Sequence, residues 1–271
     1  MRGMFTCGVI DVLMENGIRF DGAAGISAGA VFGCNYKSRQ IGRAIRYNKN
    51  FSKDPRFCSI RSLIKTGDLY GADFCYREIP DELDPFDRET FMNDPMEFYV
   101  GATDVSTGKC VFHKCTDGGE TDLKWMQASA SMPVASRPVA IGDGLYLDGG
   151  IADSIPFKYM ESLGYGHNVI VLTQPAGYVK KKAPSLMKLA LLKYPAIAEG
   201  MAVRHEMYNR QIEEIEEREH KGKVFVIRPP EPVSLGRTEK DPEKLEMAYQ
   251  MGRREARSVL PHLRVFLERD N

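Results

Sequence analysis

The residues best suited to chemistry form a G-x-S-x-G pentad, which runs from Gly25 to Gly29 with Ser27 at its centre. A short apolar run precedes the serine, and a segment able to open a helix follows it. This strand–turn–helix context is typical of a nucleophile elbow, in which a strained turn exposes the serine hydroxyl. At either glycine a side chain is expected to collide with the neighbouring strand or helix, because the backbone doubles back there. The pattern therefore predicts attack of a serine oxygen on a carbonyl carbon.

A serine hydroxyl has too high a pKa to attack unaided, so a second group must accept its proton. No histidine of the chain lies in a recognisable motif, and we interpret all of them as surface or structural residues. They are His113, His167, His205, His220 and His262. A better candidate is Asp148, which ends a short predicted strand and is followed by Gly149 and Gly150. These glycines allow a sharp turn and the close approach of another backbone, although the same residues also fit a simple hairpin or Asx turn.

The pentad around Ser27 and the run Asp148-Gly149-Gly150 together resemble the patatin-like phospholipase family, whose members use a Ser–Asp dyad without a catalytic histidine. The flanking residues agree with the family pattern at 128–133, 137–139 and 155–156. The likeness covers most of residues 1–175. It continues more loosely through residues 241–245 and Gly252, as in the bacterial branch of the family.

This resemblance implies a lipid acyl hydrolase of the phospholipase, lysophospholipase or esterase type that works through an acyl-enzyme. Ser27 would be the nucleophile, and Asp148 would take its proton directly and later activate water. Ala28 opens the following helix, whose N-terminal dipole would lie beneath the developing oxyanion. The implied partner is a lipid or ester substrate.

The family also has a G-G-G-x-[RK]-G motif whose backbone N–H groups form the oxyanion hole. This chain begins Met1-Arg2-Gly3, which matches only the last three positions of the motif. Arg2 and Gly3 are therefore the candidate oxyanion-loop residues. A misplaced start, a trimmed chain and a truncated, impaired protein would each explain the difference, and the missing strand would leave an unpaired sheet edge beside the nucleophile strand.

Two other classes of protein stay open. A degenerate, non-catalytic family member would bind without turnover. An α/β-hydrolase-type esterase would use a Ser-Asp-His triad of Ser27, Asp148 and either His167 or His205, although that fold usually places several strands before its nucleophile. A nucleotide-binding domain is disfavoured, because the chain contains neither G-x-G-x-x-G nor G-K-[ST].

The predicted elements alternate between helices and strands. Helices are expected at 4–16, 28–38, 121–132, 184–219 and 241–257, with a last short helix after Pro261, and strands at 20–26, 97–103, 109–113, 138–141, 145–147, 169–173 and 224–228. This alternation predicts a three-layer α/β/α sandwich with a mainly parallel central sheet. We expect one patatin-like acyl hydrolase domain over residues 1–271, with 184–219 as a helical insertion and 241–268 as C-terminal helices packed on the core.

The composition limits the partners. Lys and Arg together number 37, as do Asp and Glu, so no net charge attracts nucleic acid. The six cysteines are scattered without a C-x-x-C pair, which favours reduced thiols in the cytoplasm and predicts no metal site and no cofactor. Lys180, Lys181 and Lys182 precede an apolar helical stretch, a combination that suits peripheral contact with an anionic membrane but also a solvated loop. The sequence does not set the oligomeric state.

Overall fold

Strand β2 (Glu97–Asp104) is the centre of the main sheet in the computed structural model, which describes residues 1–184, 187, 190–236 and 238–268. Four further strands complete this sheet: β1 (Gly22–Ile26), β3 (Cys110–Cys115), β4 (Val139–Ile141) and β5 (Gly144–Asp148). A separate parallel pair is formed by β6 (Asn168–Val171) and β7 (Val224–Ile227). The α/β class predicted from the sequence is confirmed.

The pairing is more mixed than the mainly parallel sheet we expected. In the five-stranded sheet β1 runs parallel to β2, whereas β3 and β5 run antiparallel to β2 and β4 runs antiparallel to β5. Among the described residues, β1 pairs with β2 alone. Short turns join β4 to β5, and only antiparallel strands can be connected that way.

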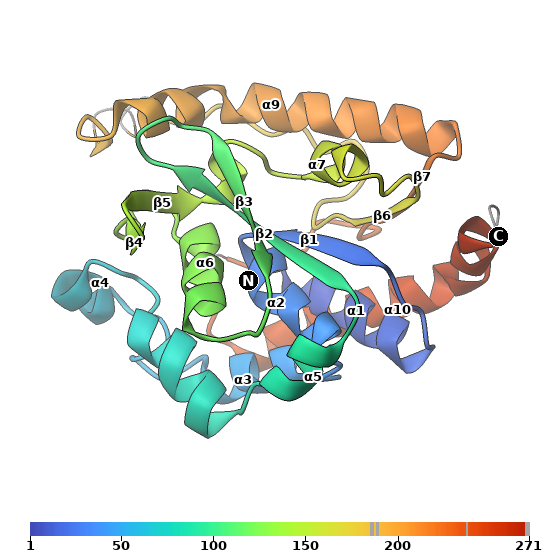
Figure 1. Cartoon of the computed structure of the whole chain (residues 1–271), viewed down its shortest axis with the longest axis horizontal. Coiled ribbons are helices and arrows are strands. Elements are labelled where there is room, and N and C mark those ends of the chain that lie inside the picture. Colours follow the sequence, from blue (N-terminus) through green and yellow to red (C-terminus); the bar gives the residue numbers. More distant parts are fainter. Residues whose placement is uncertain (185–186, 188–189, 237, 269–271) are drawn as a thin grey trace.

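Helices cover both sides of the sheet, as Figure 1 shows, with α9 along one side and α1, α2, α3 and α10 on the other. The helices before the sheet's second strand are α1 (Met4–Glu15), α2 (Ala28–Lys37), α3 (Arg43–Phe51), α4 (Ile60–Thr66), a π-helix (Phe74–Leu83) and α5 (Arg88–Asn93). Those after it are α6 (Glu120–Ala130), a 3₁₀ turn (Gly149–Ile151), α7 (Phe157–Ser162), α9 (Pro195–His220) and α10 (Pro242–Leu267). Part of the helical segment predicted at 184–219 lies outside the described residues.

The first and last long helices meet backbone to backbone. A Cβ at Gly8 of α1 would overlap the carbonyl oxygen of Tyr249 in α10, and a Cβ at Gly252 would overlap the carbonyl oxygen of Phe5. The Tyr249 hydroxyl also donates a hydrogen bond of 2.7 Å to Asp11 on α1. Only residues without a side chain allow two helices to approach this closely.

Helix α10 differs from the prediction, because it continues through Pro261 to Leu267. We expected a break there, since proline removes one helical hydrogen bond and crowds the preceding turn. The last turns bury Leu263 and Phe266, and the Phe266 ring lies 5.7 Å from the ring of Phe225 in β7. This packing on the core accounts for the continuous helix.

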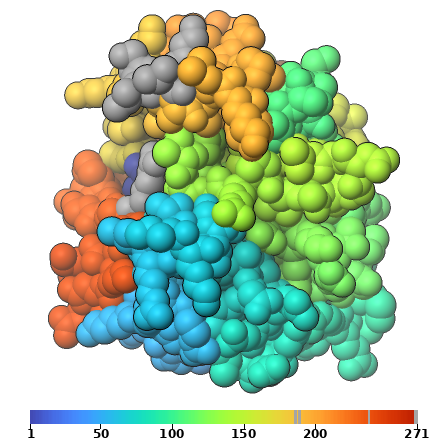
Figure 2. All heavy atoms as spheres, turned by 90° about the vertical axis from the view of Figure 1, so that its left-hand side faces the viewer, coloured from blue at the N-terminus to red at the C-terminus, as the bar shows by residue number. Residues whose placement is uncertain are grey.

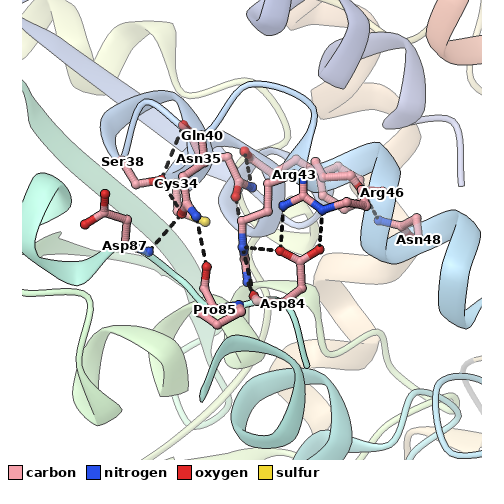
Figure 3. Close-up of polar contacts among 12 residues, drawn as sticks. Cys34, Asn35, Ser38, Gln40, Arg43, Arg46, Asn48, Asp84, Pro85 and Asp87 are labelled. Atoms are coloured by element: carbon pink, nitrogen blue, oxygen red, sulfur yellow. Dashed lines mark hydrogen bonds and ion pairs between the residues drawn. The ribbon is translucent and has the colours of Figure 1, made fainter. Parts of the chain in front are cut away.

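An ion-pair network centred on the buried Asp84 ties the segment between the π-helix and α5 to α3 (Figure 3). Arg46 binds both carboxylate oxygens of Asp84, at 2.8 and 2.7 Å, and Arg43 donates to the main-chain oxygen of Asp84 at 2.6 Å and to the side chain of Asn35 at 2.9 Å. The Arg43 side chain is only 5% exposed. Removing one partner would leave a buried charge uncompensated, which typically costs about 3–5 kcal/mol.

Candidate active site

Ser27 occupies a strained turn between β1 and α2. Its φ of 54° and ψ of −117° lie in a backbone region that residues other than glycine rarely adopt. Such a conformation typically costs about 1–3 kcal/mol. The predicted elbow geometry is therefore confirmed. The expected collision is confirmed at Gly25, where a Cβ would overlap the carbonyl group of Gly29, but it is wrong at Gly29 itself, where a Cβ would meet no described atom of another element within 4 Å.

Ser129, which the sequence analysis did not single out, holds the elbow in place. The Ser27 N–H donates to the Ser129 hydroxyl oxygen at 2.9 Å, and that hydroxyl donates to the carbonyl oxygen of Gly101 at 2.6 Å. Ser129 is fully buried on α6, so this link between α6, β1 and β2 is shielded from water. The residues around it were recognised only as a family-like flank, because a single buried serine on a helix carries no pattern of its own.

The sheet register brings Ser27 and Asp148 together. Strand β3 pairs along one edge of β2, so β1 and β5 must share the other edge. Ile26 of β1 pairs with Gly101, and Asp148 of β5 pairs with the next residue, Ala102. Consecutive strand positions are about 3.3 Å apart. The two strands therefore run toward each other and end at adjacent residues of β2. Ser27 follows the last residue of β1, and Asp148 is the last residue of β5.

The glycines after Asp148 let this meeting point close. A Cβ at Gly149 would overlap the carbonyl oxygen of Gly101, so the backbone approach expected for this run is confirmed. The Asx-turn interpretation also holds, because the Gly150 N–H donates to the Asp148 carboxylate at 2.8 Å. Thr103 donates to the main-chain oxygen of Asp148 at 2.8 Å. Asp148 is only 3% exposed, which fixes its carboxylate against the end of the sheet.

Arg204 on α9 places a positive charge beside this carboxylate. Its Nε donates to the carbonyl oxygen of Gly150 at 2.5 Å. A Cβ at Gly150 would lie 2.8 Å from Nη2 of Arg204 and 3.0 Å from Oδ1 of Asp148. No local pattern identified this residue, which lies more than fifty positions after Gly150 and reaches the site only through the packing of α9.

The predicted oxyanion residues lie at the start of α2. A Cβ at Gly3 would lie 2.8 Å from the Cβ of Ala28 and 2.6 Å from the ring of Phe32. The first amide hydrogen bonds of α2 run from Ala30 and Val31 to the Ser27 carbonyl, so the N–H groups of Ala28 and Gly29 precede the helical ladder. Such N–H groups form an anion-binding end of a helix.

These residues open into one cavity of about 1550 Å³. Ser27, Asp148, Arg2 and Gly3 line it, and α9 contributes residues spaced as one helical face: Met201, Arg204, His205 and Tyr208. Burial raises the pKa of Tyr208, while the positive charges of Arg2 and Arg204 oppose that rise. The Lys180 ammonium lies 4.3 Å from the centre of the Tyr208 ring. Arg2, Arg204 and Lys180 therefore make the side of the cavity around Tyr208 positively charged.

His113 lies apart from the cavity, whereas His167 and His205 line it. His113 pairs with Asp122 at 2.7 Å and stacks on Trp125. It belongs to a group with Cys115 whose ligand atoms lie within 4.8 Å, but the second oxygen of Asp122 already accepts three backbone N–H groups, so the carboxylate serves as a loop cap. Within the described part of the chain, Nδ1 of His205 is buried without a hydrogen-bond partner.

None of the helices that the structure describes combines the length and the apolar character required to cross a lipid bilayer.

Comparison with known proteins gives two family matches. The patatin-like phospholipase family matches residues 1–160, and a domain of unknown function (DUF6363) matches residues 194–268. The uncharacterized protein YjjU of Escherichia coli K12 is 27% identical over 278 residues, which cover 93% of this chain and 72% of that protein. Uncharacterized NTE family proteins Mb1092c of Mycobacterium bovis and Rv1063c of Mycobacterium tuberculosis are 27% identical over 155 residues, or 57% of this chain and 41% of theirs. The family match covers more than half of the chain and includes both the Ser27 elbow and the Asp148 turn, and the chain therefore belongs to the patatin-like phospholipase family.

Proposed function

We propose that this chain is a lipid acyl hydrolase in which Ser27 and Asp148 form the catalytic dyad. The observation that carries the proposal is the register of β2, which ends β1 and β5 at adjacent residues and so brings the strained serine and the buried carboxylate into one cavity. Positioning of this kind supplies a large part of enzymatic rate enhancement.

In the first half of the proposed reaction, Oγ of Ser27 attacks the ester carbonyl carbon and its proton passes to the Asp148 carboxylate. The N–H groups of Ala28 and Gly3 stabilise the oxyanion of the tetrahedral intermediate. The intermediate collapses as the ester C–O bond breaks, and the proton on Asp148 passes to the leaving alkoxide. The products are an alcohol and an acyl group on Ser27.

In the second half, Asp148 takes a proton from water, and the resulting hydroxide attacks the acyl carbon. Collapse of the second tetrahedral intermediate releases the carboxylic acid and returns the proton to Ser27. Arg204 acts as a positioning residue, because its bond to the Gly150 carbonyl fixes the turn that carries Asp148.

The test is labelling by a fluorophosphonate together with turnover of a p-nitrophenyl ester. We expect the unmodified chain to be labelled and active, Ser27→Ala to lose both, and Asp148→Asn to lose at least about a thousandfold in kcat. Persistent labelling of Ser27→Ala would exclude Ser27 as the nucleophile. Absence of both labelling and turnover in the unmodified chain would instead favour an impaired, non-catalytic family member.

A Ser-Asp-His triad is the second candidate mechanism. Its histidine would be His205 rather than His167, because Nδ1 of His205 is buried beside the cavity and has no hydrogen-bond partner among the described residues. The dyad predicts that His205→Ala and His167→Ala each retain turnover within about tenfold of the unmodified chain. A loss as large as that of Asp148→Asn in either variant would establish the triad.

The proposal includes a cellular location and a domain organisation. All six cysteines are free thiols, which agrees with a reducing, cytoplasmic location. The backbone contact between α1 and α10 supports one domain over residues 1–271, with α9 and α10 packed on the core. Limited proteolysis checks this organisation, since one domain yields a single cooperative loss of resistance.

A further inference from the structure

Helix α4 presents its apolar side chains to solvent. Ile60 is 71% exposed and Ile64 is 81% exposed, and they lie one helical turn apart on the same face. No residue of α4, all of which are described, is buried. A surface helix normally turns its apolar stripe toward the core, so α4 carries an apolar face that the rest of the described chain does not cover.

This helix stands at the rim of the active-site cavity. It lies between Cys58 and Tyr70, which form a β-bridge at its base, and Phe57 and Tyr70 line the cavity. The end of α4 is tied to the loop after α6, because the Leu69 N–H donates to the Ala135 carbonyl at 2.9 Å. That loop adds Val134, which is 58% exposed.

The opposite rim has the same character. Val179 lines the cavity and is 67% exposed, and Leu192, shortly before α9, is 68% exposed. Lys181 and Lys182 are exposed between them. Figure 2 shows the face that carries both rims, with the light-blue segment containing α4 below, the yellow and orange residues leading into α9 above, and a hollow with dark-blue atoms from the start of the chain at its bottom.

The charges of both rims have one sign. Between Asp54 and Asp68 the chain contains basic residues, Arg61 and Lys65 among them, but no carboxylate. Residues 162–198 likewise contain lysines and no Asp or Glu. In a chain whose formal net charge is zero, this separation makes the cavity mouth basic as well as apolar. Interfacial segments that insert apolar side chains under anionic headgroups have this composition.

We propose that the rim formed by α4, Val134, Val179, Lys181, Lys182 and Leu192 docks on an anionic lipid bilayer and places the cavity mouth against it. This inference rests on the proposed function, since a lipid hydrolase must receive its substrate from a membrane or micelle. An anionic bilayer fits this surface for two reasons. Its headgroups complement the charge of the lysines, and the rim is continuous with the cavity that would receive a lipid. Ile60 and Ile64 insert among the acyl chains, while Lys181 and Lys182 contact the headgroups.

Co-sedimentation with vesicles tests the docking without turnover when all proteins carry Ser27→Ala. The vesicles contain phosphatidylcholine with or without about 30% phosphatidylglycerol. We expect binding to the anionic vesicles, at least about a tenfold weaker partition for Ile60→Asp/Ile64→Asp, and a loss of the anionic preference for Lys181→Glu/Lys182→Glu. Val265→Asp is the matched control, because Val265 is 54% exposed on α10, which ends on the opposite side of the molecule (Figure 1).

Activity provides an independent readout in protein with Ser27 intact. Ile60→Asp/Ile64→Asp should keep its turnover of a soluble p-nitrophenyl ester and lose hydrolysis of vesicle lipid. Equal vesicle binding by this variant and the Val265→Asp control would overturn the proposal. So would a concentration-dependent dimer abolished by Ile60→Asp/Ile64→Asp, because the face would then join two copies of the chain. Vesicle binding by a chain without any esterase activity would support the docking and overturn the proposed hydrolase.

Discussion

Two regions of the molecule bring backbones into contact through glycine, and they differ in what the contact achieves. At the elbow, Gly25 lies against the carbonyl group of Gly29, and nearby Gly149 lies against that of Gly101. The first contact holds the start of α2 against the end of β1, and the second holds the turn after β5 against β2. The result is a strained serine next to a buried carboxylate, a local arrangement that contributes chemistry while costing stability.

At the crossing of α1 and α10, Gly8 lies against Tyr249 and Gly252 lies against Phe5. No strained residue lies there, and the partners are more than two hundred positions apart in the chain. The crossing stabilises the fold and has no direct chemical role. The comparison shows that the same residue type serves function where it lies beside a strained serine and a buried carboxylate, and serves stability where it lets two helices pack closely.

The largest effect is expected from Ser27→Gly at the elbow, which should lower activity and raise stability. Loss of the hydroxyl should lower kcat/KM by at least about 10⁴-fold. Glycine adopts a φ of 54° without strain, so the free energy of unfolding should rise by about 1 kcal/mol. Esterase assays and urea unfolding measure the two quantities. A variant less stable than the unmodified chain would show that the turn is not strained.

The next largest effect is expected from Gly252→Ala at the crossing. The added methyl group must push α1 and α10 apart, which should lower the free energy of unfolding by about 3 kcal/mol. Gly29→Ala is the matched control, since it also adds a methyl group to a helix but meets no described atom of another element within 4 Å. Helix propensity should make that control neutral or up to about 1 kcal/mol more stable. Equal destabilisation of both variants would contradict the comparison.

A smaller effect is expected from Ser129→Ala, which removes the partner of the Ser27 N–H. A buried N–H left without an acceptor costs about 1–3 kcal/mol, and the looser elbow should lower kcat about 10- to 100-fold with little change in KM. Ser131→Ala is the control, because that hydroxyl donates to the carbonyl oxygen of Gln127, whereas the Ser129 hydroxyl bridges Ser27 and Gly101. Equal kcat values for the two variants would show that Ser129 does not position the nucleophile.

The smallest effect concerns the pH dependence of the crossing. Burial raises the pKa of Asp11 to about 6 in the folded protein. Because this pKa lies above the ordinary pKa of an aspartate in the unfolded chain, Asp11 binds its proton more tightly in the folded state. The free energy of unfolding should therefore rise by about 1 kcal/mol as the pH falls from 7 to 5. Asp11→Asn keeps an acceptor for Tyr249 and should lose this increment. Thermal melts at both pH values measure it, and an unchanged pH dependence in Asp11→Asn would assign it elsewhere.

Much of the fold could be predicted because its signals are local. The helix predicted at 4–16 matches α1, which ends just before Gly17 with its φ of 67°, and the G-x-S-x-G and D-G-G runs identified the two strand ends. The helix through Pro261 could not be predicted, since distant packing outweighs the local effect of proline. Ser129 and Arg204 were missed for the same reason: each acts on a backbone group of another element, which no spacing along the chain reveals.

The crossing of α1 and α10 also sets an order of events during synthesis. Met4, Phe5 and Val9, which are fully buried in the folded protein, leave the ribosome before α10, which begins more than two hundred residues further along the chain. At ordinary translation rates α1 waits on the order of ten seconds or longer for its partner. A nascent chain with an uncovered apolar helix is a substrate for chaperones. Fragments that stop before Asp241 should therefore aggregate, even though they contain every residue of the proposed dyad.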